Sequence, residues 1–165
     1  MIETIRAPAQ FLTDAAVRRG VDLIFVGYRQ YRDSLDDELA KAGLGQAHHR
    51  AIYFINRVEA VSPKALGEYL GITKQSLARV TVDLKSGGYI DETSNTRDRR
   101  VKHLYLTDKG VELERRLYEG AKDRMKKAYS EAGPHAVQGF WDVLSGLVGG
   151  DGPSAYTELL AHHKG

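Results

Sequence analysis

Three arginines and one aspartate lie within six residues of the chain, where two strand-like segments would meet. Residues 96–101 read Thr-Arg-Asp-Arg-Arg-Val, between "YIDETS" and "VKHLYLT", which both alternate apolar and polar side chains. Alternation with a period of two is typical of a strand with one buried face. The spacing therefore predicts a β-hairpin whose tip carries concentrated positive charge, which favours an anionic partner.

The three arginines and the aspartate of this tip could have different roles in binding an anionic partner. An arginine at such a position can enter the minor groove of DNA, where A-tracts carry a strong negative potential. Arg97, Arg99 and Arg100 are the candidate residues of this tip for contact with an anionic partner. Asp98 can pair with a neighbouring guanidinium and hold it extended. A solvated loop could have the same composition, so the neighbouring elements decide between the two interpretations.

The segment before the hairpin predicts two short helices joined by a tight turn. Ser62 followed by Pro63 is a helix start signal, and Gly71 ends this first helix. Thr73 can cap the second helix, and the glycines at 87–88 can end it. A short helix, a turn, a second helix and a hairpin make a winged helix-turn-helix.

The second helix of this unit has one apolar and one polar side. Leu77, Val80 and Leu84 recur at steps of three and four and predict a buried stripe. The second helix of such a pair enters the DNA major groove, where base edges present a distinct pattern of donors and acceptors. The residues left exposed for base edges and phosphates are Thr73, Lys74, Gln75, Ser76 and Arg79.

Helices are predicted on both sides of this unit. Apolar residues recur at helical spacing from Asp14 to Ala42, which predicts one long amphipathic helix, and a second helix follows over Gln46–Val58. A helix of about 25 residues begins near Thr107, and another begins at Pro134. The fold class is therefore mainly α with a small β-hairpin, an α+β fold built around a winged helix-turn-helix.

The amino-acid composition of the chain excludes several classes of function. The net charge is only +2, yet residues 62–109 hold nine Lys/Arg against six Asp/Glu, which concentrates the positive charge on the helix-turn-helix and hairpin. The absence of cysteine excludes disulfides, thiolate catalysis and thiol-based sensing. No apolar stretch is long enough to span a membrane, and the N-terminus has no signal-peptide pattern. We expect a soluble cytoplasmic protein.

Enzymatic function is not indicated. The chain has no recognisable Ser/His/Asp pattern, no phosphate-binding glycine loop between a strand and a helix, and no telling pair of carboxylates. We therefore expect neither catalysis nor a cofactor. The alternative function is a winged helix that contacts another protein without specific DNA binding. Such a module would carry apolar or acidic side chains at 74–79, and retention on heparin with its salt dependence would distinguish the two.

Residues 62–113 resemble the DNA-binding core of the MarR family of bacterial transcriptional regulators. The most specific elements are "DRR" at Asp98–Arg100 in the wing and "LTDKG" at Leu106–Gly110 at the start of the next helix. The resemblance implies a homodimer whose first and last helices interlock, acting as a repressor on a palindromic double-stranded DNA operator. It implies a DNA-binding lobe over 46–110 and a dimerisation region of 1–45 and 107–165, within one intertwined domain. It also implies that Arg100 reaches the minor groove.

Family members bind small anionic or aromatic effectors between these regions, and the sequence offers a candidate site. Tyr28, Arg29, His49 and Tyr53 could line it. The adjacent His48 and His49 point about 100° apart on a helix, and no carboxylate stands one turn away, so no metal site is predicted. Surface or capping positions are expected for both histidines.

Overall fold

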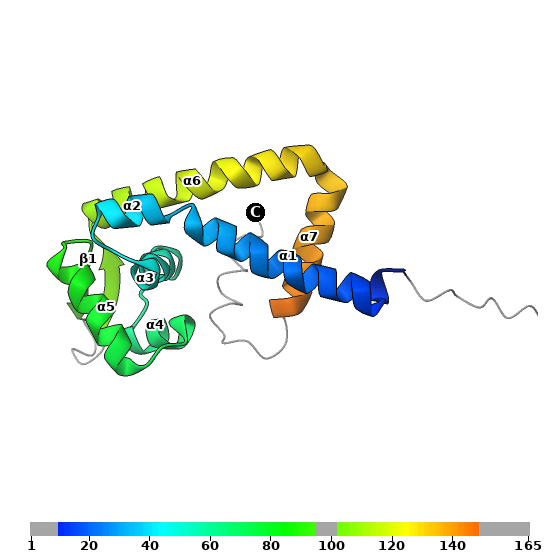
Figure 1. The fold of residues 1–165 in the computed structure, drawn as a ribbon. Coiled ribbons are helices and arrows are strands. Elements are labelled where there is room, and N and C mark those ends of the chain that lie inside the picture. Colours follow the sequence, from blue (N-terminus) through cyan, green and yellow to red (C-terminus); the bar gives the residue numbers. More distant parts are fainter. Residues whose placement is uncertain (1–9, 95–101, 149–165) are drawn as a thin grey trace, which may run out of the picture.

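The fold is a small winged lobe from which long helices extend. The computed structural model describes residues 10–94 and 102–148. Its elements are η1 (Gln10–Leu12), α1 (Asp14–Asp33), α2 (Asp36–Lys41), α3 (Gln46–Arg57), α4 (Pro63–Leu70), α5 (Lys74–Ser86), β1 (Ile90–Ser94), β2 (Lys102–Leu106), α6 (Asp108–Ala132) and α7 (Pro134–Val148). α2, α3, α4, α5 and the hairpin form the lobe, and α1 and α6 extend from it on the same side (Figure 1).

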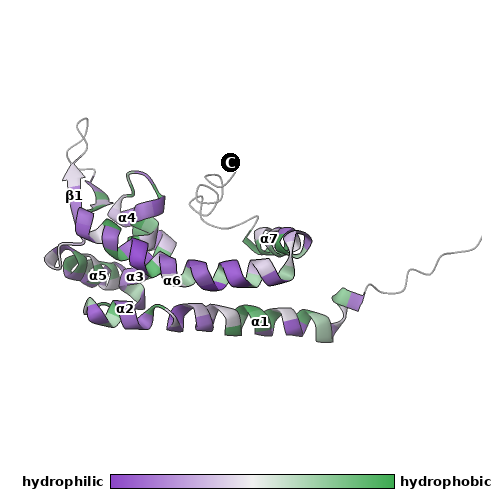
Figure 2. Ribbon diagram, turned by 90° about the horizontal axis from the view of Figure 1, so that it is seen from above, coloured by the Kyte–Doolittle hydropathy of each residue, from purple (hydrophilic) through white to green (hydrophobic). Residues whose placement is uncertain are grey.

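The hydrophobic core lies within the lobe. It joins Ile52 of α3, Leu66 of α4 and Leu84 of α5, none of which has any exposed surface. Leu39 of α2 and Leu113 of α6 belong to the same core, so the beginning of α6 is part of the lobe. In contrast, α1 and α7 contain no buried residue, although both are rich in apolar residues (Figure 2).

The predicted continuous helix over Asp14–Ala42 is wrong, because the chain breaks at Ser34. The Ser34 hydroxyl donates to the Tyr31 carbonyl at 2.6 Å, and the Leu35 amide bonds to Arg32 instead, three residues back. A serine side chain that competes for a backbone carbonyl in this way weakens the helix. The break separates the exposed α1 from α2, which packs into the lobe.

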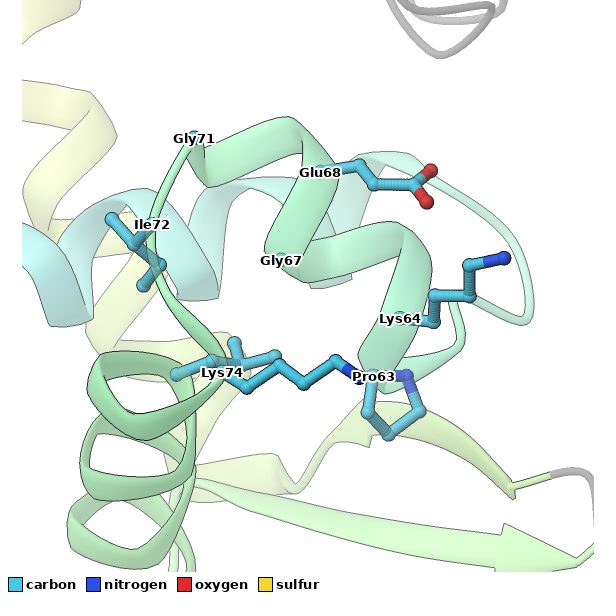
Figure 3. A pocket seen from close by; sticks show the side chains of 8 residues that line it. Pro63, Lys64, Gly67, Glu68, Gly71, Ile72 and Lys74 are labelled. Carbon is cyan, nitrogen blue, oxygen red and sulfur yellow. The ribbon is translucent and has the colours of Figure 1, made fainter.

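The helix-turn-helix forms as the sequence predicts. Ser62 caps α4 by accepting the Ala65 amide at 3.2 Å, and Gly71 ends α4 with a left-handed φ of 61°. Thr73 then caps α5 by accepting the Ser76 amide at 3.2 Å. Only Gly71, Ile72 and Thr73 separate the two helices, so α5 turns sharply away from α4 (Figure 3).

The hairpin is attached to the lobe through its backbone. β1 and β2 pair antiparallel, with Ile90 opposite Leu106 and Ser94 opposite Lys102. The Leu104 amide donates to the Val61 carbonyl at 2.9 Å, which fixes β2 beside the loop that precedes α4. An isolated two-stranded hairpin is only marginally stable, so this support is needed.

The start of α6 is anchored by the "LTDKG" segment. Thr107 accepts the Gly110 amide at 3.2 Å as the helix cap, and its hydroxyl donates to the Gly88 carbonyl at 2.6 Å. Gly110 is buried, and a Cβ atom there would lie 2.0 Å from the Tyr89 carbonyl oxygen. The motif thus couples the helix cap to the end of the turn that leads into β1.

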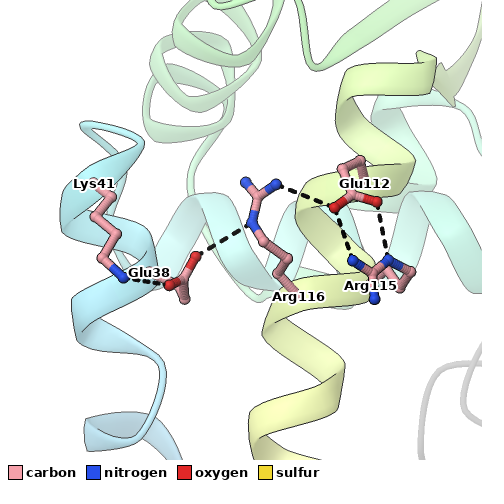
Figure 4. A network of polar contacts seen from close by, with 5 residues as sticks. All are labelled: Glu38, Lys41, Glu112, Arg115 and Arg116. Atoms are coloured by element: carbon pink, nitrogen blue, oxygen red, sulfur yellow. Dashed lines mark hydrogen bonds and ion pairs between the residues drawn. The ribbon is translucent and has the colours of Figure 1, made fainter.

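Ion pairs connect α2 to α6 on the outside of the lobe (Figure 4). Glu38 pairs with Lys41 at 2.6 Å and with Arg116 at 3.3 Å, while Glu112 pairs with Arg115 at 2.9 Å. The hydrogen bond from Lys41 lowers the pKa of Glu38. Because these pairs are solvent-exposed, each adds little stability, and the apolar core carries most of the packing. No helix among the described residues is long and apolar enough to cross a membrane.

Candidate nucleic-acid interface

The exposed side of α5 is polar and basic in its first half. Thr73, Lys74, Gln75, Ser76 and Arg79 are all exposed, while Leu77, Val80 and Leu84 are buried as predicted. At 100° per residue, Gln75 and Arg79 lie nearly opposite this buried stripe. Of the five residues of α5 predicted to contact DNA, Gln75 and Arg79 therefore point most directly away from the core.

The capping residues of α5 are partly engaged with each other. The Thr73 hydroxyl donates to the Ser76 hydroxyl at 3.1 Å, in addition to accepting the Ser76 amide. Their side chains therefore order the first turn of α5. The free amides of that turn remain at the exposed helix end, where anions are favoured.

Lys74 lies on the flank of α5 that faces α4. A groove of about 640 Å³ separates the two helices there, lined by Pro63, Lys64, Gly67, Glu68, Gly71, Ile72, Lys74 and Leu77. The Lys74 side chain extends across this groove toward Pro63 (Figure 3). Lys64 also lines the groove, but its side chain points away from α5 (Figure 3), so Lys74 is the groove lysine suited to a phosphate beside α5.

The wing tip of Arg97, Asp98, Arg99 and Arg100 lies outside the described residues, so its predicted roles stay predictions. The stem of the wing is described, and Glu92 of β1 holds it to α5. Its carboxylate accepts hydrogen bonds from Lys85 at the end of α5 and from Lys102 of β2, the latter at 2.6 Å.

The Lys102 and Lys85 hydrogen bonds lower the pKa of Glu92, so it is ionised at neutral pH. Glu92 thereby connects the recognition helix to both strands of the wing through a single carboxylate. Spacing along the sequence does not predict this cluster, because the contact between Lys85 and Glu92 depends on how the hairpin folds back along α5.

The two adjacent histidines have different environments. His48 accepts the Gly45 amide at 3.1 Å through Nδ1, and its Nε2 lies 3.1 Å from an Asp83 carboxylate oxygen. The capping position predicted for His48 is therefore confirmed, and the ring also connects α3 to α5. The surface position predicted for His49 is wrong, because His49 is only 8% exposed.

His49 lies in a row of aromatic rings. Its ring centroid is 6.2 Å from that of Tyr31 and 6.5 Å from that of Tyr53, and Tyr31 stacks on Tyr28 at 6.5 Å. Burial, and to a lesser extent the charge of Arg50, lowers the pKa of His49 to about 4. Burial also raises the pKa of Tyr31. The His49 and Tyr31 rings are thus uncharged at neutral pH.

The structure brings together three of the four residues predicted to line an effector site. Tyr28, His49 and Tyr53 belong to the row of rings, whereas Arg29 is 79% exposed and pairs with Asp33 on its own helix. The guanidinium beside the rings belongs instead to Arg57, which lies 5.4 Å from the Tyr53 ring centroid. Arg57 follows Tyr53 by one helical turn. This spacing in the sequence could have identified Arg57 as a candidate residue of the effector site.

Arg57 also connects α3 to α6. Its guanidinium lies 5.9 Å from the Tyr118 ring centroid, and Lys122 is 5.8 Å from the same ring. Cations over aromatic faces stabilise such a site and leave it positively charged. Within residues 10–94 and 102–148, no three His, Asp or Glu side chains come together as a metal site would require.

Comparisons with known proteins agree with this geometry. The MarR family model matches residues 42–101. The chain is 44% identical over 138 residues to the HTH-type transcriptional regulator PetP of Rhodobacter capsulatus, and the alignment covers 84% of this chain and 83% of PetP.

Solved structures share the fold. A MarR family transcriptional regulator from Silicibacter pomeroyi superposes with a TM-score of 0.66 at 18% identity, over 86% of this chain and 94% of its own. Streptococcus pneumoniae FabT in complex with DNA gives 0.65 at 20% identity, over 79% and 94%. NadR in complex with 4-hydroxyphenylacetate gives 0.67 at 19% identity, over 87% and 99%. The fold is thus the winged helix of these regulators, and by its identity to PetP the chain belongs to the MarR family of transcriptional regulators.

Proposed function

We propose that the protein is a repressor that binds a palindromic operator as a homodimer and is released by a small effector. The observation that carries this proposal is the exposed row of Gln75 and Arg79 on α5, opposite the buried stripe of the helix. An α-helix fits the major groove, where a guanidinium bonds guanine and an amide bonds adenine through two atoms each. Membership of the MarR family and the fold shared with DNA-bound FabT support the same docking.

The other candidate residues have roles that follow from their positions in this docking. We assign phosphate contacts to Lys74 and to the first turn of α5 at Thr73 and Ser76. In the wing, Arg100 is assigned to the minor groove and Arg97 and Arg99 to the flanking backbone. Asp98 orients these guanidinium groups by pairing with one of them.

The test of DNA docking compares two substitutions in α5. Arg79→Ala should weaken specific binding by about 1–3 kcal/mol and relax the preference at one operator position. Lys74→Ala should weaken binding to all sequences alike and make the salt slope shallower by about one ion. Binding to the selected operator and to random DNA, measured across a salt series, separates the two. An unchanged operator affinity in both variants would show that α5 does not dock as proposed.

The apolar surface of α1 supports the homodimer. Val17, Val21 and Ile24 form the stripe that the sequence indicated, and all three are about half exposed. Leu23, Phe25 and Val26 lie on the other sides of the same helix, and Phe25 is 78% exposed. Residues 23–26 thus make one turn of α1 apolar on every side, and such a turn is normally buried.

A second copy of the chain can supply this cover if α1 inserts between its helices. α7 adds further apolar surface, because Phe140, Trp141 and Leu147 are 42%, 48% and 64% exposed. We therefore assign dimerisation to the regions 1–45 and 107–165, apart from α2 and the beginning of α6, which pack with 46–110 in the DNA-binding lobe.

Size-exclusion chromatography with light scattering should give about 37 kDa, twice the chain mass of 18.3 kDa, at micromolar concentration. Ile24→Glu should dissociate the dimer, because a carboxylate would be buried at the interface without a partner. Arg19→Glu, on another side of α1, introduces the same side chain at a polar position and serves as control. A monomer of 18.3 kDa for the unmodified protein would contradict the assembly.

We assign effector binding to the region beside Tyr28, His49 and Tyr53, with Arg57 as the cation. Aromatic faces and one guanidinium suit a small anionic or aromatic molecule. NadR, which shares the fold, was solved in complex with 4-hydroxyphenylacetate, a molecule of this class. Native mass spectrometry of the purified dimer would reveal a ligand that stays bound through purification.

A further inference from the structure

Val82 is an exposed apolar residue on the outward side of α5. It is 59% exposed, whereas Val80 of the same helix is 6% exposed and packs into the core. Val82 follows Arg79 by three residues and Gln75 by seven, which places the three side chains in one row. Ala78, also exposed, lies one turn before Val82.

Packing of the lobe does not account for a valine at this position. Val82 is absent from the hydrophobic core and from the residues packed against it. An exposed valine also lowers helix propensity relative to alanine, lysine or glutamine. The apolar surface assigned to the dimer lies on α1, which extends away from the lobe, and on α7, at the far end of α6, so a second copy does not explain Val82 either (Figure 1).

The DNA major groove contains an apolar feature that fits this position. The C5-methyl group of thymine projects into the groove, and small apolar side chains contact it. Valine is β-branched and keeps one preferred rotamer in a helix, so its methyl groups lose little freedom on contact. Arg79 and Val82 are separated by about 4.5 Å along the helix axis, close to the roughly 3.4 Å between successive bases of a strand.

We propose that Val82, flanked by Ala78, determines specificity by contacting the methyl group of a thymine next to the base pair that Arg79 reads. The inference rests on the proposed DNA-binding function and deepens it, because it names a chemical group in each operator half-site. The spacing of residues in α5 indicates a buried stripe and a polar face, and Val82 belongs to neither. The position of Val82 on the side of the helix opposite Leu77 and Leu84 could have identified it from the sequence as an exposed apolar residue.

The experiment replaces thymine by deoxyuridine, which removes only the methyl group. The operator is first selected from random duplex DNA with the unmodified protein, and each thymine of one half-site is then replaced in turn. We expect one replacement to weaken binding about fourfold, the effect of one methyl-sized apolar contact. Val82→Ala removes this contact in both half-sites of the homodimer, so it should weaken binding to the thymine operator about sixteenfold and should not respond further to the replacement in one half-site.

Val111→Ala is the matched control, because Val111 is 50% exposed and lies on α6 rather than α5. This variant should keep the full response to deoxyuridine. If no replacement affects the unmodified protein, or if Val82→Ala keeps the fourfold response, the inference is overturned while the selected operator still supports the proposed function. If selection enriches no sequence, the proposed function fails, and the thymine contact fails with it.

Discussion

Gly110→Ala is expected to lower the free energy of unfolding by about 3 kcal/mol, which is a large part of the total stability of a small domain. The added Cβ atom would lie 2.0 Å from the Tyr89 carbonyl oxygen and 3.3 Å from the Leu106 Cβ atom. The Tyr89 carbonyl cannot move away freely, because it accepts the Thr107 amide at 3.1 Å. The clash must therefore displace α6 from the hairpin or break the helix cap.

Gly120→Ala provides the control within the same helix. Gly120 is exposed, and an added Cβ atom there would meet nothing within 4 Å. Alanine should stabilise this position by about 0.5–1 kcal/mol through its better helix propensity. Urea unfolding followed by circular dichroism at one fixed protein concentration compares the variants. Equal stability of the two would show that α6 can shift away from Tyr89 at little cost.

Lowering the pH from 7.5 to 5 is expected to remove about 2 kcal/mol of stability through His49 alone. Burial lowers the pKa of this ring from 6.5 to about 4 in the folded state. The unfolded chain takes up the proton near pH 6.5, whereas the folded protein does so only near pH 4. The contribution is therefore fully present above pH 6.5 and is lost as the pH falls toward 4.

His49→Phe isolates this contribution. Phenylalanine keeps a ring between Tyr31 and Tyr53 but takes up no proton, so the fall in unfolding free energy between pH 7.5 and 5 should shrink by about 2 kcal/mol. The comparison uses the difference between the two pH values for each protein, which cancels any constant effect of the substitution on packing. The same pH dependence in both proteins would mean that His49 is protonated within the folded state.

The helix caps and helix ends of the helix-turn-helix were predicted correctly, because they depend on contacts between residues close together in the sequence. Ser62 and Thr73 cap their helices through contacts only three residues away, and the left-handed φ of Gly71 follows from its missing side chain. The helix break at Ser34 was missed because a serine hydroxyl can accompany either a continuous or an interrupted helix. The spacing of apolar residues on either side of Ser34 is the same for a continuous and for an interrupted helix.

Contacts between distant segments could not be predicted from spacing. His49 is buried because Tyr31 of α1 and Tyr53 of its own helix lie on either side of it. The position of Arg57 between two tyrosine rings depends likewise on how α6 packs across α3. The polar face of α5 was predicted correctly from the period of its buried stripe, whereas the roles of the wing tip stay predictions.

The Glu92 cluster has a consequence for the thermodynamics of DNA binding. Small cations condensed along a duplex are displaced by protein cations that take their place, and the number displaced sets the salt sensitivity of the complex. The single carboxylate of Glu92 offsets one of the two positive charges of Lys85 and Lys102, so this pair displaces fewer ions than two unpaired lysines would. Lys74 and Arg79 have no ion pair among the residues that the structure describes. Between α5 and the stem of the wing, the larger share of the entropy of ion release should therefore come from α5.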